Sequence, residues 1–166
     1  MLVEFSVSNY RSIRERQALS LAANTGKELR DSHVMESGAP ATPDLLRSVV
    51  IYGANASGKS NLLYALMFVR DFVRQSATQR QHGEAIAHQP FALGLTEGEA
   101  GPSEFEVVFV QHGTRYQYGL SVTREAVLAE WLYAYPEGRA QLWFRRQAKA
   151  PGDKPDWEFG PSLRGQ

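Results

Sequence analysis

The chain has 166 residues, of which 43% are hydrophobic, with 18 basic and 18 acidic side chains and no cysteine. This length and composition suit one globular domain and argue against a disordered or fibrous chain. The lack of cysteine excludes disulfides, thiolate zinc sites and thiol nucleophiles, and zero net charge removes the simplest argument for nucleic-acid binding.

The N-terminal part predicts a hairpin followed by a loop. Apolar and polar residues alternate over residues 2–8 and again over 18–22, which is the period of half-buried strands, so residues 1–23 are predicted as a β-hairpin. Residues 24–47 hold glycine and proline without a sustained period and predict a loop. The chain starts without a signal-peptide pattern and has no apolar run of membrane-spanning length, so we expect a cytoplasmic protein without a membrane partner.

Residues 48–75 predict a strand, a glycine-rich loop and a helix. The run 48–52 is short, apolar and rich in β-branched residues, which is typical of a buried central strand. From Lys59 to about Arg74 the apolar residues recur on one wide helical face that should pack on a sheet. The residues of that face are Leu62, Ala65, Leu66, Phe68, Val69, Phe72 and Val73.

The second half of the chain predicts an antiparallel sheet. Residues 76–103 are polar and are interpreted as a connector. Residues 104–160 contain alternating strands around turns at 111–113 and 136–138, with a weak last strand at 157–159. This region is therefore predicted as an antiparallel β-meander.

The loop between the predicted strand and helix matches the phosphate-binding pattern of Gly, four residues, Gly-Lys and Ser or Thr. Gly53 and Gly58 allow the backbone to approach a triphosphate, Lys59 can reach the β- and γ-phosphates, and the Ser60 hydroxyl can bind Mg²⁺. An Asn-Lys-x-Asp base-recognition motif is absent from the sequence, which favours ATP over GTP. The predicted ATP and Mg²⁺ site comprises Gly53, Ala54, Asn55, Ala56, Ser57, Gly58, Lys59, Ser60 and Asn61.

Two stretches carry a resemblance to a known group of proteins. Residues 5–13 read Phe5-x-Val7-x-Asn9-Tyr10-Arg11-Ser12-Ile13, and the loop continues as Ser60-Asn61-Leu62-Leu63. Together they resemble the N-terminal lobe of ABC-type ATPase heads of the RecF, SMC and OLD-like group. The amino-acid sequence of the loop is most similar to that of bacterial AAA-family ATP-binding proteins related to OLD nucleases and abortive-infection systems. The similarity covers nearly the whole chain, and the phosphate-binding loop is its only highly specific motif.

The resemblance implies an α/β P-loop NTPase fold: an ABC-ATPase-like N-terminal lobe in which an antiparallel β-meander surrounds a central strand and the P-loop helix. It also implies Mg²⁺-dependent ATP hydrolysis by a head-to-head homodimer, with a DNA-directed or phage-defence output and DNA or a nuclease effector as partner. A Walker B Asp-Glu pair and a Leu-Ser-Gly-Gly signature are not found, so we expect the C-terminal lobe to be absent, no catalytic residue in this chain and little turnover by it. The alternative is a module that senses nucleotide or docks on a partner without turnover.

Arg11 has two interpretations. The resemblance implies a position close to the bound phosphates, whereas a solvated turn arginine beside Arg14 and Arg16 is equally consistent with the sequence. Tyr10 is predicted to belong to the core.

Other candidate side chains receive structural interpretations. His82 and His88 are predicted to be surface histidines, because their spacing suits no common zinc motif. The pair Arg145 and Arg146 is predicted as a solvated strand end. The tryptophans and neighbouring tyrosines at strand spacing favour cross-strand packing over a base-stacking platform. These aromatic residues are Tyr116, Tyr118, Trp131, Trp143 and Trp157.

Overall fold

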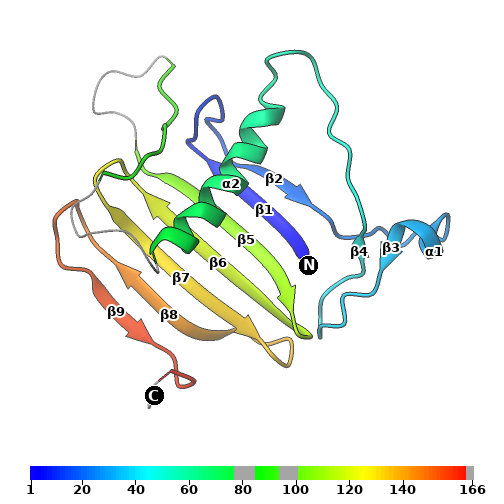
Figure 1. Cartoon of the computed structure of the whole chain (residues 1–166). Coiled ribbons are helices and arrows are strands. Elements are labelled where there is room, and N and C mark those ends of the chain that lie inside the picture. Colours follow the sequence, from blue (N-terminus) through cyan, green and yellow to red (C-terminus); the bar gives the residue numbers. More distant parts are fainter. Residues whose placement is uncertain (77–84, 94–100, 164–166) are drawn as a thin grey trace.

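The computed structural model describes residues 1–76, 85–93 and 101–163. Its main feature is a seven-stranded antiparallel sheet, in the order β2-β1-β5-β6-β7-β8-β9, with one long helix lying across one face (Figure 1). The elements of this layer pair are β1 (Leu2–Ser8), β2 (Gln17–Ser20), α2 (Lys59–Ser76), β5 (Ser103–Gln111), β6 (Thr114–Val122), β7 (Val127–Tyr135), β8 (Gln141–Gln147) and β9 (Asp156–Phe159).

Strands β5 to β9 follow one another as a meander, and the hairpin β1–β2 joins it through β1. The tight turn between β5 and β6 places His112 and Gly113 at φ 48° and 72°, the left-handed conformation that two-residue hairpin turns require. Phe5 of β1 faces Val107 of β5, and Val7 faces Phe105. Because opposed residues of antiparallel strands share a face, the apolar side chains of β1 and β5 point to the same side of the sheet.

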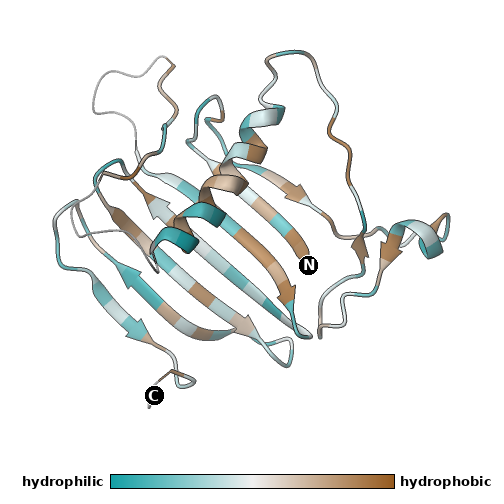
Figure 2. Ribbon diagram, in the orientation of Figure 1, coloured by the Kyte–Doolittle hydropathy of each residue, from teal (hydrophilic) through white to brown (hydrophobic). Residues whose placement is uncertain are grey.

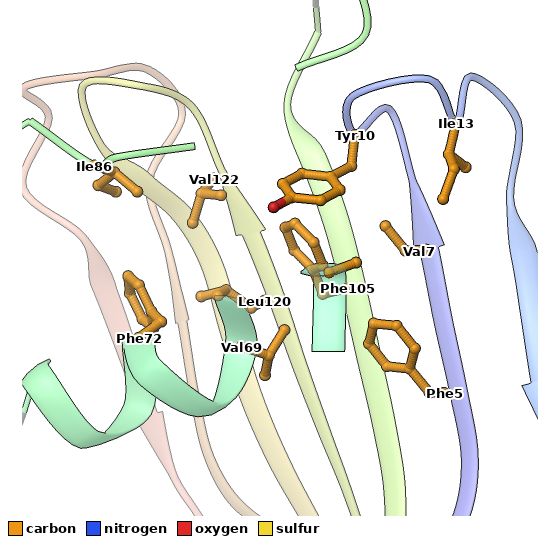
Figure 3. Close-up of a cluster of buried hydrophobic side chains, with 11 residues drawn as sticks. Phe5, Val7, Tyr10, Ile13, Val69, Phe72, Ile86, Phe105, Leu120 and Val122 are labelled. Atoms are coloured by element: carbon orange, nitrogen blue, oxygen red, sulfur yellow. The ribbon is translucent and has the colours of Figure 1, made fainter. Parts of the chain in front are cut away.

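The core lies between that face and α2, as Figure 3 shows. Ala65, Val69 and Phe72 of α2 are buried against Phe105 and its neighbours on the sheet. Burying each large side chain of this kind contributes about 1.5–3 kcal/mol. Tyr10 is also buried, with its ring 5.4 Å from that of Phe105 in an edge-on contact, which confirms its predicted place in the core.

A smaller layer covers the end of the sheet near the N-terminus. It contains α1 (Arg30–His33) and the two-residue strands β3 (Val34–Met35) and β4 (Leu45–Leu46), which pair with each other. These short elements form within the stretch 24–47, which was predicted as an uninterrupted loop. Leu45 is fully buried in a second apolar cluster with Val3 and Val110, and the ion pair between Arg30 and Asp44 ties α1 to the residues before β4.

The predicted central strand at 48–52 is not formed. These residues have no ladder partner among the described residues, and Val50 and Tyr52 are 68% and 88% exposed. In the sheet, β1 has β2 on one side and β5 on the other, and the outer edge of β2 carries no strand from 48–52. An apolar, β-branched sequence favours an extended backbone, but a strand also needs an unpaired neighbouring edge. The strands β1 and β5 are therefore neighbours inside the antiparallel sheet, and residues 48–52 do not contribute a strand to it.

Helix α2 matches the predicted start at Lys59 and continues to Ser76. Several apolar side chains of α2 remain about half exposed, among them Leu63, Tyr64 and Met67. Figure 2 colours the ribbon of this helix by hydropathy and shows brown, pale and teal segments along it. No helix within the described part of the chain combines the length and the apolar character that a membrane crossing needs.

The opposite face of the sheet holds Trp131, which lies over Gly119 on the neighbouring strand β6. A Cβ atom added to Gly119 would fall 1.9 Å from ring carbons of Trp131. Real Cβ contacts are never that short, so the indole position depends on glycine at this site. Of the other two tryptophans, Trp143 packs edge-on against Tyr116 and Trp157 stacks on Phe159, which agrees with the packing interpretation.

We predict that Gly119→Ala lowers the free energy of unfolding by about 1–3 kcal/mol, the usual cost of overpacking. Urea denaturation measures this change. Gly101→Ala is the control, because a Cβ at Gly101 meets nothing within 4 Å. Adding Trp131→Ala to the Gly119→Ala variant should make the two losses less than additive. Equal stability of the Gly119→Ala and Gly101→Ala variants would contradict this account.

Candidate nucleotide-binding site

The predicted phosphate-binding loop runs from Gly53 to the start of α2 at Lys59. Its conformation requires glycine at Gly58, whereas a side chain at Gly53 would have to displace the Ser57 hydroxyl. Gly58 has φ 91°, in the left-handed region, and a Cβ at Gly53 would lie 2.8 Å from the Ser57 Oγ atom. Ala56 also adopts a positive φ of 63°, which is uncommon for a residue with a side chain. The loop is therefore a tight backbone ring that leads directly into the first turn of the helix.

The side chain of Lys59 folds back onto the start of the loop. Its Nζ atom donates hydrogen bonds to the carbonyl oxygens of Gly53 at 2.8 Å and Ala54 at 2.7 Å, and to Ser57 Oγ at 3.4 Å. The ammonium group thus lies inside the loop at the N-terminus of an 18-residue helix. A lysine charge, the helix dipole and the free N–H groups of a first helical turn all favour an anion at this point. Ser60 is exposed beside them.

The turn between β1 and β2 packs against the loop. Asn61 donates a hydrogen bond from Nδ2 to Ser12 Oγ at 2.6 Å, and the same oxygen would lie 3.3 Å from a Cβ at Gly58. A cavity of about 420 Å³ opens between this turn and the loop. Its lining residues are Ser12, Ile13, Arg14, Gln17, Ile51, Tyr52, Ser57, Gly58, Lys59 and Leu62.

Arg11 lies apart from the residues that line this cavity. Its backbone N–H donates to the Gln89 carbonyl at 2.8 Å, and its guanidinium carbon is 4.5 Å from the centre of the Tyr64 ring on α2. Arg14, three residues further on, does line the cavity. The β1–β2 turn does lie beside the loop, but the residues that it brings to the cavity are Ser12 and Arg14. The sequence analysis did not name these two as site residues. The sequence signal that could have identified them is their position: Ser12 lies inside the stretch 5–13 that carries the resemblance, and Arg14 follows it directly.

The two arginines predicted as a solvated strand end differ in their exposure. Arg146 forms an ion pair with Glu130 at 2.8 Å, and both side chains are largely shielded, so it is not a solvated strand end. Arg145 does lie at the surface, where it pairs with Glu158 at 2.7 Å. His82 lies outside the described residues.

His88 was predicted at the surface and this prediction is wrong, since its side chain is only 6% exposed. Its ring packs against Phe68 of α2 at 6.1 Å between centroids, and among the described residues neither ring nitrogen has a hydrogen-bond partner of normal geometry. Burial lowers the pKa of His88, the backbone of Ile86 opposes that shift, and the charge of Arg124 adds to it. The segment 85–91 therefore carries an imidazole into the core beside the helix, where burial disfavours its charged form.

A glycine-bounded loop that holds a lysine ammonium at a helix N-terminus, on a mixed α/β framework dominated by an antiparallel sheet, fits a P-loop NTPase-like fold. Residues 48–166 match the family model described as "AAA domain, putative AbiEii toxin, Type IV TA system". Because the match covers more than half of the chain, the protein belongs to this family of AAA domains. Nucleotide binding is the activity that this family suggests. No curated protein sequence is significantly similar to the chain.

We predict that His88 makes stability depend on pH. Its folded pKa is lowered, so the unfolded chain binds a proton that the folded chain excludes. The free energy of unfolding should therefore fall as pH decreases below the unfolded pKa of about 6.5, until the folded pKa is reached. Urea denaturation between pH 5 and 8, roughly centred on that value, measures the slope.

His88→Leu should flatten this part of the profile, while His112→Gln, which changes an exposed histidine in the β5–β6 turn, should retain it. The explanation fails if the His88→Leu variant and the unmodified chain lose stability in parallel as the solution is acidified.

Proposed function

We propose that the chain binds ATP together with Mg²⁺ at the loop 53–61. The observation that carries this proposal is the position of the Lys59 ammonium, which is held by the Gly53 and Ala54 carbonyls at the N-terminus of α2. These hydrogen bonds can be exchanged for phosphate oxygens with little movement of the lysine. The nearby cation Arg14 and the helix dipole add to the attraction for an anion.

Each residue of the loop has a role in this proposal. The backbone N–H groups of residues 53–58 would surround the phosphates, and Lys59 would neutralise the β- and γ-phosphates. Ser60, exposed on the first turn of α2, would offer its hydroxyl to Mg²⁺, which supplies charge neutralisation between the phosphates. Asn61 keeps the β1–β2 turn in place through Ser12. The residues present thus fit both groups.

The larger proposal is that this domain is the N-terminal lobe of an ABC-type, OLD-like ATPase head in the cytoplasm. None of the described residues that line the cavity is a carboxylate that could polarise an attacking water. Hydrolysis would therefore need groups from elsewhere, as in a head-to-head dimer that closes around ATP. The family description names a putative toxin of a type IV toxin–antitoxin system, which supports a defence-related output. DNA or a nuclease effector as partner stays a proposal that rests on the sequence resemblance.

We predict that Mg-ATP or a slowly hydrolysed analogue stabilises the chain against heat. At a ligand concentration 100-fold above Kd the gain is about 2.7 kcal/mol, which for a domain of this size raises Tm by roughly 5–10 °C. Lys59→Ala should abolish the shift, since the ammonium is lost, and differential scanning fluorimetry measures it. Lys149→Ala is the matched control, because Lys149 is an exposed cation in the β8–β9 connection. A folded chain whose Tm stays constant up to millimolar Mg-ATP would argue against the site.

The three arginines of the first turn should respond differently to nucleotide. Arg11→Ala is expected to weaken binding of an ATP analogue more than binding of ADP, if the guanidinium leaves the Tyr64 ring to contact the γ-phosphate. Arg14→Ala should weaken both, because its side chain lines the cavity. Arg16→Ala is the control, since its guanidinium pairs with Glu106 at 3.5 Å and does not line the cavity. Calorimetric titration separates these cases, and identical losses for both nucleotides in Arg11→Ala would leave Arg11 a structural role only.

A further inference from the structure

The cavity beside the predicted phosphate-binding loop has walls that a phosphate does not need. Gly58 and Lys59 contribute the loop side of its lining. The other lining residues include an exposed aromatic ring at Tyr52, an amide at Gln17 and a guanidinium at Arg14. The volume of about 420 Å³ lies within the usual range of small-molecule pockets, about 300–1,000 Å³. Phosphate oxygens offer no surface on which an aromatic ring can stack, so these walls suit a further part of a ligand.

The β1–β2 turn forms a fixed wall of this cavity. Within the turn, Tyr10 and Ile13 exchange two backbone hydrogen bonds at 2.8 Å, and the Ile13 side chain is buried. From α2, Asn61 donates to Ser12 Oγ at 2.6 Å, which holds the turn beside the first turn of the helix (Figure 1). A wall that is already ordered lowers the entropy cost of binding a ligand against it.

Two of the lining side chains are open to a ligand. Tyr52, the residue before the first glycine of the loop, is 88% exposed, so most of its ring surface is accessible. Arg14 is exposed as well. In the described part of the chain its guanidinium has no carboxylate partner, and it lies 5.9 Å from the centre of the Phe91 ring. Neither side chain has to break an ion pair before it contacts a ligand.

The loop decides which part of a nucleotide would meet these side chains. In such loops the lysine reaches the β- and γ-phosphates, and the backbone N–H groups hold the α- and β-phosphates. Ser12 Oγ lies 3.3 Å from the position that a Cβ atom of Gly58 would occupy, so the β1–β2 turn lies next to the backbone that would hold these phosphates. The nucleoside is joined to the α-phosphate, which puts the turn and Tyr52 within its reach.

We propose that the cavity contains a nucleoside subsite, in which the base of the nucleotide stacks on the Tyr52 ring and its edge contacts the Gln17 amide. The inference rests on the proposed function, because it takes the phosphates to lie in the loop. An aromatic face stacks on any base, and an amide offers both a donor and an acceptor to the base edge. The planar Arg14 guanidinium adds a stacking contact from the side of the turn. The chain therefore binds nucleotides in preference to polyphosphates in general.

The test compares two ligands by calorimetric titration, a slowly hydrolysed ATP analogue and inorganic tripolyphosphate, each with Mg²⁺. Tyr52→Ala should weaken binding of the ATP analogue about fivefold or more, the usual loss when a stacked base loses its aromatic partner, and should leave tripolyphosphate binding unchanged. Tyr52→Phe keeps the ring and should bind the ATP analogue as the unmodified chain does. Gln17→Ala should also weaken only the ATP analogue, since tripolyphosphate has no base edge.

Val50→Ala is the matched control, because Val50 is exposed in the same stretch as Tyr52 and is not among the described residues that line the cavity. This variant should bind both ligands normally, and circular dichroism shows whether each variant is folded. The nucleoside subsite is overturned, and the phosphate site retained, if tripolyphosphate binds but Tyr52→Ala keeps full affinity for the ATP analogue or loses affinity for both ligands equally. If neither ligand binds the folded chain, the loop is no phosphate site and both proposals are wrong.

Discussion

Burial of the apolar face of α2 on the antiparallel sheet is the interaction on which the other features depend. Val69 and Phe72 reach the same cluster as Phe5 and Phe105, so one helix fastens the N-terminal hairpin to the meander. Because a helix is stiff, fixing its middle on the sheet also fixes the direction of its first turn. Among the described residues, the predicted phosphate-binding loop is held by that turn and by the β1–β2 turn that touches it. Packing in the core therefore sets the position of a loop that contributes little to the core itself.

The sequence predicts those parts of the fold that have a strong period or a tight motif. The apolar spacing from Leu62 to Val73 indicates α2, the alternation after residue 104 indicates the strands β5 to β8, and the glycine spacing indicates a phosphate-binding loop. Each of these signals is local, since the residues that produce it are neighbours in the element that they form. The antiparallel register then follows from short turns such as the one at Gly113, which leave the strands little choice of partner.

What the sequence does not predict depends on contacts between distant segments. Residues 48–52 have strand-forming side chains, but they have no partner strand among the described residues. His88 lies in a polar stretch, yet the segment 85–91 is tied to Arg11 and Asn9 and brings its ring onto Phe68. Arg146 has the charge of a surface residue, and only the register of β7 with β8 places Glu130 opposite to it. In each case a long-range pairing overrides a local preference.

The pairing of β1 with β5 has a consequence for the order in which the protein can be made. The Met1 ammonium donates to the carbonyl oxygen of Val110 at 2.7 Å, a contact between residues 109 positions apart. At a synthesis rate of about 5–20 residues per second, β1 emerges from a ribosome roughly 5–20 s before its partner strand exists. During that interval Phe5 and Val7 have only the short strand β2 and, later, helix α2 beside them, without the strands β5 to β9 that complete the sheet. Long-range pairing of this kind slows folding, so a nascent chain of this protein keeps its largely buried first strand unpaired with β5 for most of its synthesis.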